Sequence, residues 1–150
     1  MGKTGRTAQT TSQPAGGWLF KEEPDHYSYA DLERDGTALW DGVKNNLARQ
    51  HLRDVRPGDR VLYYHTGNER AIVGEMRVTA GPQAGTAGDD PKAVAVTVAP
   101  VRRWPQAVTL QMIKNDPLFA DWELVRLPRL SVLPVSAEQW RRLAQLGGVS

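Results

Sequence analysis

The residues of this sequence best suited to chemistry lie in one segment, residues 40–56. Trp40 offers a large aromatic face, and two carboxamides follow it at Asn45 and Asn46. Three arginines at helical spacing come next: Arg49, Arg53 and Arg56. An aromatic face can hold a planar ring by stacking, which contributes about 1–3 kcal/mol, and carboxamides can read the polar edge of that ring. The segment therefore has the residue types of a site for a planar polar ligand, although a Trp40 that only fills the core is an open alternative.

The standard motifs of catalytic and cofactor sites are missing from the sequence. It contains no phosphate-binding loop, no dinucleotide-binding glycine pattern, no serine-hydrolase elbow and no His-Glu-x-x-His pair. Glu22 and Glu23 are adjacent carboxylates, but neighbouring side chains of an extended segment point to opposite faces, so we do not expect an acid–base pair. His51 and His65 are the other candidate bases, and a histidine on a helix is more often a packing residue. We expect no enzyme activity and no cofactor.

Composition indicates one globular domain without a metal centre. The chain has 150 residues, of which 40% are hydrophobic and 24% charged, as in a protein with a single core. It has no cysteine and only three histidines, so disulfides and thiolate zinc sites are excluded and no metal is expected. No apolar run reaches the roughly 18 residues that span a bilayer, and no signal-peptide core is present. We therefore expect no membrane association and a location inside the cell.

The positive charge of the chain is concentrated near its N-terminus. Residues 1–17 contain no aliphatic side chain larger than alanine after Met1, which predicts a disordered tail over residues 1–16 and a single domain over residues 17–150. Lys3 and Arg6 account for the whole positive excess, because the remaining residues include 17 basic and 17 acidic side chains. Attraction to phosphate must then come from local clusters of arginine rather than from net charge.

Hydrophobic spacing predicts short strands and short helices without regular alternation. Strands are expected at residues 18–20, 60–65, 71–79 and 92–103, and at residues 124–135 with an interruption at Pro128. Helices are expected at residues 29–34 and 46–56, from Thr109, and after Ser136. Gly74, inside a strand, predicts that another group approaches the backbone closely. These elements predict the α+β class: a curved, mostly antiparallel sheet or small β-barrel with short peripheral helices.

Four motifs in this order resemble the EVE domain family, a member of the PUA-like superfamily. They are WLFKEEP at residues 18–24, WDGVKN at 40–45 with Ala48 and Arg49, VLYYH at 61–65, and RLSV at 129–132 with Pro134. The resemblance implies a PUA-like barrel and a pocket for a flipped, often modified nucleobase, without catalytic activity. One departure is Glu22, where the family commonly has serine. If Glu22 lines the pocket, its ligand preference is expected to differ from the usual one.

The resemblance also implies positions for individual side chains. Lys21 and Glu22 are expected at the pocket edge, Trp40 and Asn45 at its wall, Tyr64 and His65 at a strand end, and Ser131 on the far side. Asn46 is a further ligand-binding candidate because of its carboxamide. Arg49 is expected to approach a phosphate, and Arg53 and Arg56 to hold the backbone. The expected partner is modified DNA, with a base such as 5-methylcytosine or 5-hydroxymethylcytosine, or modified RNA. The protein is expected to be a monomer, cytoplasmic in a prokaryote and nuclear in a eukaryote.

Two other functions stay open at the level of sequence. One is a small enzyme that acts on a modified nucleoside, with Glu22 or His65 as its base. The other is a protein-interaction module whose N-terminal tail recruits partners.

Overall fold

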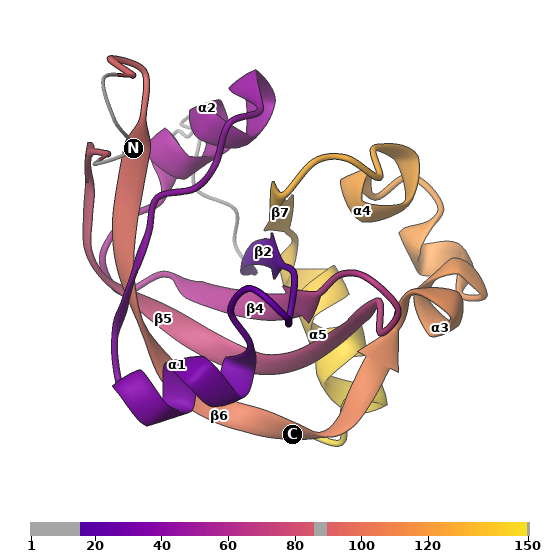
Figure 1. The fold of residues 1–150 in the computed structure, drawn as a ribbon. Helices are drawn as coiled ribbons and strands as arrows, with labels where there is room; N and C mark the ends of the chain where they lie inside the picture. The colour runs from indigo at the N-terminus through magenta and orange to yellow at the C-terminus, as the bar shows by residue number, and fades with distance from the viewer. Residues whose placement is uncertain (1–15, 86–89, 150) are drawn as a thin grey trace, which may run out of the picture.

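Most of the strands and helices in the structure lie where the sequence predicts them. The computed structural model describes residues 16–85 and 90–149 (Figure 1). Its strands are β2 (Gly17–Glu22), β3 (Ala38–Trp40), β4 (Arg60–His65), β5 (Ala71–Ala84), β6 (Val94–Thr109) and β7 (Val132–Val135). Its helices are α1 (Tyr29–Asp35), α2 (Asn46–Asp54), α3 (Leu110–Lys114), the 3-10 turn η1 (Pro117–Phe119), α4 (Glu123–Arg126) and α5 (Ala137–Leu146). The predicted tail lies outside the described residues, apart from Gly16.

The strands form one sheet in the order β3-β6-β5-β4-β2-β7. Only β2 and β4 pair in parallel among these strands, and the other neighbours are antiparallel. The long strands β5 and β6 bend strongly and curve the sheet (Figure 1). The expected α+β class, with a curved, mostly antiparallel sheet and short surrounding helices, is confirmed.

Strand β2 runs through the middle of the core because its sequence is apolar on both faces. Trp18, Leu19 and Phe20 are all buried. Leu19 is level with Leu62 of β4 on one side and with Leu133 of β7 on the other. A strand covered on both faces and paired at both edges holds its last residues, Lys21 and Glu22, in fixed positions.

The N-terminal caps of the helices match the sequence signals. Ser28 and Ser136 each form the predicted capping box, at the start of α1 and α5. Thr109 caps α3 in the same way. Of the helices in the described residues, none has the length and apolar character needed to cross a bilayer.

The close approach predicted at Gly74 is confirmed, and the approaching group is the ring of Tyr29. A Cβ atom on Gly74 would lie 2.7 Å from Tyr29 Cε1. The Tyr29 hydroxyl donates a hydrogen bond to the Glu75 carbonyl oxygen at 2.6 Å. Helix α1 is thereby fastened to the sheet at one fixed point.

The strand prediction for residues 124–135 was wrong in its first half. Residues 123–126 form α4, and only residues 132–135 form a strand. The Trp122 indole donates to the Pro134 carbonyl oxygen at 2.8 Å, so the chain folds back on itself between these elements. Helix α4 is a single turn, too short for its periodicity to be distinguished from that of a strand. The short strand β3, which forms one wall of the site below, was not predicted.

Candidate functional site

A cavity of about 690 Å³ opens where β2 ends. The turn after β2 and helix α1 form one side, β3 and the residues after it form the second, and the segment before β7 forms the third. Its lining residues are Lys21, Glu22, Glu23, His26, Tyr27, Asp35, Thr37, Ala38, Leu39, Trp40, Asp41, Gly42, Val43, Thr66, Pro128, Arg129 and Ser131. Four of the residues expected to bind the ligand are in this lining: Lys21, Glu22, Trp40 and Ser131.

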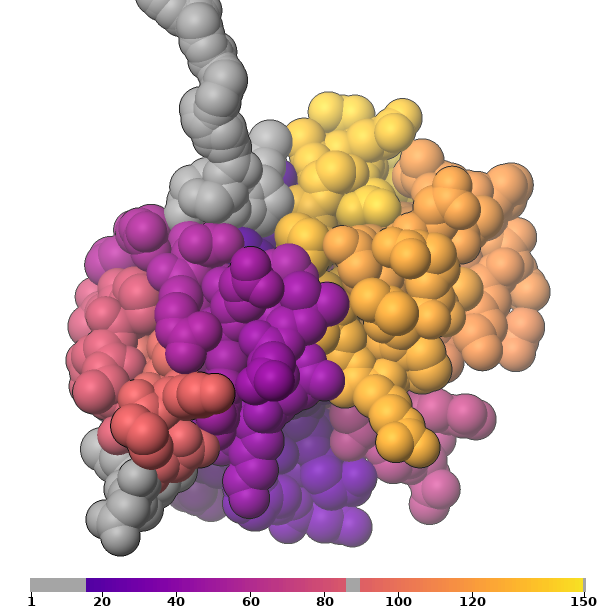
Figure 2. Space-filling view, turned by 90° about the horizontal axis from the view of Figure 1, so that it is seen from above, coloured from indigo at the N-terminus to yellow at the C-terminus, as the bar shows by residue number. Residues whose placement is uncertain are grey.

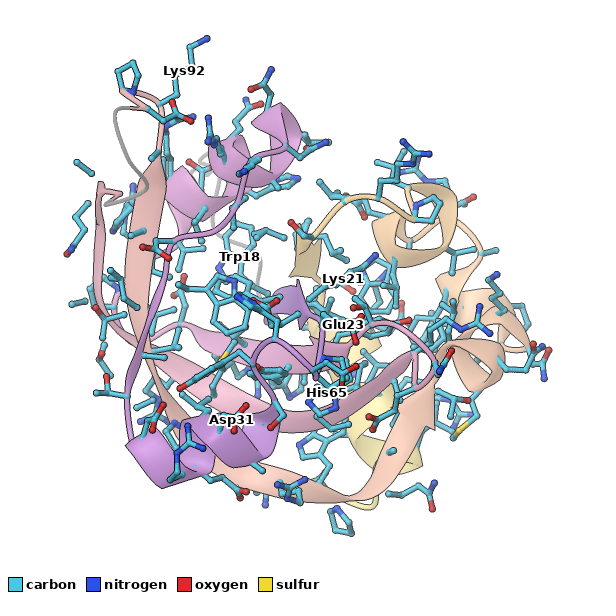
Figure 3. All side chains as sticks on the ribbon, in the orientation of Figure 1. Trp18, Lys21, Glu23, Asp31, His65 and Lys92 are labelled. Carbon is cyan, nitrogen blue, oxygen red and sulfur yellow. The ribbon has the colours of Figure 1, made fainter. Side chains whose placement is uncertain are left out.

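Lys21 and Ser131 join two walls of the cavity. The backbone N–H of Lys21 donates to the Ser131 carbonyl oxygen at 2.9 Å. The Lys21 ammonium donates to the Pro128 carbonyl oxygen, also at 2.9 Å, and lies 5.6 Å from the centre of the Tyr64 ring. Figure 3 shows Lys21 extending from the end of β2 beside Glu23. Burial lowers the pKa of Lys21 to about 8, so a pH change just above neutrality alters the charge of this wall.

Glu22 presents a carboxylate whose orientation is fixed. Its Oε2 atom accepts the backbone N–H of Glu23 at 3.1 Å and lies 3.0 Å from His26 Nδ1. Oε1 of Glu22 accepts no hydrogen bond from the residues that the structure describes. The side chain is 27% exposed and lines the cavity. The carboxylate can therefore accept a hydrogen bond from a ligand without first reorienting.

Glu23 also lines the cavity, contrary to the expectation that adjacent carboxylates would diverge. Strand β2 ends at Glu22, so the alternation of side chains does not extend to the next residue. The Glu23 carboxylate accepts a hydrogen bond from the Thr66 hydroxyl at 3.2 Å. Glu22 and Glu23 together add hydrogen-bond acceptors to the lining of the cavity.

Trp40 forms part of the wall but is mostly a core residue. It is 6% exposed, and its ring lies 5.5 Å from Phe20 and 5.3 Å from Tyr63, measured between ring centres. Tyr27 and Leu39 leave more of their surface free at the cavity, and Leu39 is 40% exposed. The Tyr27 hydroxyl donates to Asp35 at 2.8 Å. Sequence reasoning missed Tyr27 and Leu39, because β3 was not predicted and Tyr27 belongs to no periodic segment.

Asn45 and Asn46 lie outside the lining of this cavity. The side chain of Asn45 caps α2, since its Oδ1 atom accepts the Ala48 N–H at 3.0 Å. Asn46 is exposed in the first turn of the helix. The carboxamide at position 45 is thus required for the helix start.

Tyr64 and His65 are buried in β4 and are also absent from the lining. His65 Nε2 accepts the backbone N–H of Tyr29 at 3.0 Å, and His65 Nδ1 lies 2.9 Å from Glu69 Oε1. Because Nε2 is an acceptor, the ring proton resides on Nδ1 and is donated to Glu69. Figure 3 shows His65 directed toward α1. His51 lies against Trp18, with 6.0 Å between ring centres, and does not reach the cavity either.

Arg49, Arg53 and Arg56 do not form one exposed stripe on a helix, since α2 ends at Asp54 and Arg56 lies beyond it. Arg49 is only 7% exposed, and its guanidinium donates to the Val43 carbonyl oxygen at 2.8 Å and to Asp90 at 2.6 Å. Arg53 and Arg56 are exposed, although each donates to a nearby carbonyl oxygen. Arg129, at the cavity rim, is exposed and makes no hydrogen bond within the described part of the chain. Arg129 is thus the cavity residue best placed to meet an anion.

Figure 2 shows residues 40–56 and the segment around α4 side by side on one face of the molecule. Asn45 and Leu47 share a second, shallower hollow with residues 126–130 on this face. Within residues 16–85 and 90–149, no three His, Cys, Asp or Glu side chains gather as metal ligands would. The cavity lining combines the polar side chains of Glu22 and Ser131 with the apolar side chains of Trp40 and Leu39.

Comparisons with known proteins place this chain in a family. The EVE domain matches residues 17–146. Mouse thymocyte nuclear protein 1 is 29% identical over 158 aligned residues, which cover 82% of this chain and 70% of that protein. A crystal structure of a protein from Agrobacterium tumefaciens is 32% identical with a TM-score of 0.85, over 88% of this chain and 92% of that one. Human THYN1, solved in complex with DNA containing 5-methylcytosine, is 26% identical with a TM-score of 0.80, over 89% and 98% of the two chains. The chain belongs to the EVE domain family.

Proposed function

We propose that this protein binds nucleic acid that carries a modified base, and that the cavity at the end of β2 holds this base after it has left the helix stack. The observation that carries the proposal is the cavity itself, in whose lining the Lys21 N–H donates to the Ser131 carbonyl oxygen and the Glu23 N–H donates to the Glu22 carboxylate. Its volume of about 690 Å³ lies within the usual range of ligand pockets, about 300–1,000 Å³. The related human THYN1 was solved with DNA containing 5-methylcytosine, which supports DNA with this base as the partner.

The walls offer the two kinds of contact that a base requires. Trp40, Tyr27 and Leu39 supply apolar surface for the faces of the ring and for a methyl group. Glu22, Ser131 and backbone groups of residues 40–43 supply hydrogen bonds for its edge. Extrusion of a nucleotide costs a few kcal/mol, roughly, and costs least where the base is mispaired or single-stranded. The cavity contacts offset this cost only when the base fits.

Phosphates would be held by arginines outside the cavity. Arg129 at the rim is free to contact the phosphate next to the captured base, and Arg53 on α2 and Arg56 just after this helix are exposed. Such contacts add affinity without sequence information. Since Arg49 is buried and paired with Asp90, we assign it to the fold rather than to the phosphate contact.

The test uses Gly42, which lines the cavity and whose Cβ position has no heavy atom within 4 Å. Gly42→Phe is expected to place a ring in the cavity and to lower affinity for a 5-methylcytosine oligonucleotide at least tenfold. Gly42→Ala is the matched control and should bind as the wild type does. This pair is preferable to Trp40→Ala, because Trp40 packs against the core residues Phe20 and Tyr63.

Binding is measured at stated salt with single- and double-stranded DNA and RNA, each with and without the modified base. Equal affinity for modified and unmodified strands would contradict the proposal. So would full affinity in Gly42→Phe. Extrusion itself is followed with 2-aminopurine beside the modified base, whose fluorescence should rise on binding as stacking is lost. Unchanged fluorescence would mean that the base stays in the helix.

A further inference from the structure

The second inference concerns Glu22, and it rests on the proposed function. Glu22 places a carboxylate in the cavity lining, held at Oε2 by the Glu23 N–H and by His26, with Oε1 left without a donor among the described residues. An ionised carboxylate only accepts hydrogen bonds. Any ligand edge that faces Glu22 must therefore present an N–H or O–H group.

This requirement separates two pyrimidines of nearly the same shape. 5-Methylcytosine and thymine share the ring and the 5-methyl group, so apolar contacts to the methyl group cannot distinguish them. At position 4 the first carries an amino group, a donor, and the second a carbonyl oxygen, an acceptor. Thymine is also present throughout ordinary DNA. A cavity that recognised only shape and methyl group would be occupied by thymine everywhere.

We propose that Glu22 is the specificity determinant that makes the cavity accept a 4-amino pyrimidine and reject its 4-carbonyl counterpart. The 4-amino group of the captured base donates to Glu22 Oε1. The carbonyl oxygen of thymine in the same position would face the carboxylate, leaving two acceptors opposed and Oε1 without a hydrogen-bond donor. Sites that bind a donor in this way reject analogues lacking it far more strongly than apolar pockets reject a changed methyl group.

The fixed orientation of the carboxylate supports this role. Glu22 follows the fully buried residues Leu19 and Phe20 on a strand paired at both edges, and its own carbonyl oxygen accepts the Thr66 N–H at 3.0 Å. The side chain is therefore positioned before a ligand arrives, and thymine cannot be accommodated by a shift of the backbone.

The experiment compares single-stranded oligonucleotides that differ only at one position, so that no base pair has to be broken. Wild-type protein should bind the 5-methylcytosine strand about 10- to 100-fold more tightly than the thymine strand. Glu22→Gln is nearly isosteric, and its amide can turn to donate to O4, so the ratio should fall to about threefold or less. Glu138→Gln removes the same charge from the exposed start of α5 and should keep the wild-type ratio.

A third strand, with 5-methylpyrimidin-2-one at the same position, tests the inference without changing the protein. This base has hydrogen in place of the amino group, and we expect it to bind wild-type protein at least tenfold more weakly than 5-methylcytosine. The test remains available if Glu22→Gln does not fold.

Three outcomes would overturn the inference, and they are distinguishable from failure of the proposed function. Thymine bound as tightly as 5-methylcytosine, an unchanged ratio in Glu22→Gln, or full affinity for 5-methylpyrimidin-2-one would each show that Glu22 does not select the base. None of these three outcomes would contradict the proposed function, which is binding of a modified base in the cavity. Absence of binding to every strand would contradict the proposed function, and the inference with it.

Discussion

Arg49 Nη2 donates a hydrogen bond to Asp90 Oδ2 at 2.6 Å, across 41 positions of the sequence. The same guanidinium donates through Nε to the carbonyl oxygen of Val43, which lines the cavity. One buried side chain therefore connects α2, the loop that forms a cavity wall, and the approach to β6. The residue supports the site from behind rather than facing a ligand.

Loss of this side chain should destabilise the protein. Arg49→Ala leaves the Val43 carbonyl oxygen without its charged donor, which is expected to lower the free energy of unfolding by about 1–3 kcal/mol. Arg53→Ala, four residues on and exposed, should change it by less than about 0.5 kcal/mol. Urea unfolding of the two variants measures both values. Equal stability of the two would show that the buried contacts of Arg49 contribute nothing.

The exposed arginines should act on binding instead of stability. Arg53→Ala and Arg56→Ala are each expected to weaken nucleic-acid binding by a similar factor for modified and unmodified strands, because phosphate contacts carry no base information. Each should also reduce the slope of log affinity against log salt by about 1. Titrations at several salt concentrations give this slope. If either variant changed the preference for the modified base, the arginine it lacks would contact the base and not only a phosphate.

The contact between Gly74 and Tyr29 allows a test of the packing. A methyl group at position 74 would lie 2.7 Å from Tyr29 Cε1, and the buried ring cannot move away. Gly74→Ala is therefore expected to cost about 1–3 kcal/mol of stability through overpacking. Gly42→Ala, where the added atom meets open space, serves as the control. Thermal unfolding of both variants is the measurement, and a Gly74→Ala protein as stable as this control would contradict the packing described.

Lys21 should make stability depend on pH in a defined direction. Burial lowers its pKa to about 8 in the folded state, against 10.5 for the free side chain. Between these values the unfolded chain binds a proton that the folded protein has released, so folding becomes more favourable as pH rises. Relative to Lys21→Met, wild-type stability should increase from pH 8 to 9.5. A difference that stays constant over this range would mean that Lys21 titrates normally.

Part of this site could be predicted because it lies on a continuous strand. The apolar run 18–20 identified β2, and a polar residue directly after a buried strand has little freedom in where it points. The family resemblance implied that these two polar residues, Lys21 and Glu22, lie at the pocket edge, and both line the cavity. Trp40 at the wall and Ser131 on the far side were also inferred from the family resemblance, and both residues line the cavity.

The other features of the site depend on contacts between distant parts of the chain, which no local sequence pattern reveals. Asn45 and a ligand-reading carboxamide look alike in sequence, but the N-cap position of α2 uses its side chain. Arg49 has the spacing of an exposed arginine, and only the position of Asp90 in space shows that it is buried and paired. Residues 37–39 reach the cavity because β3 pairs with β6, more than fifty positions later. Long-range pairing of this kind decides which side chains meet, and spacing along the chain does not report it.

The position of β2 between β4 and β7 has a consequence for synthesis of the protein. The backbone N–H of Lys21 pairs with the Ser131 carbonyl oxygen, which follows 110 positions later in the chain. Contacts between such distant segments are slow to form, because the entropy cost of closing a long loop must be met before the new contacts stabilise the fold. A nascent chain on the ribosome exposes one edge of the buried strand β2 until β7 emerges. We expect this interval to be the period in which the protein is most prone to aggregate, and the ligand cavity to be among the last features to form.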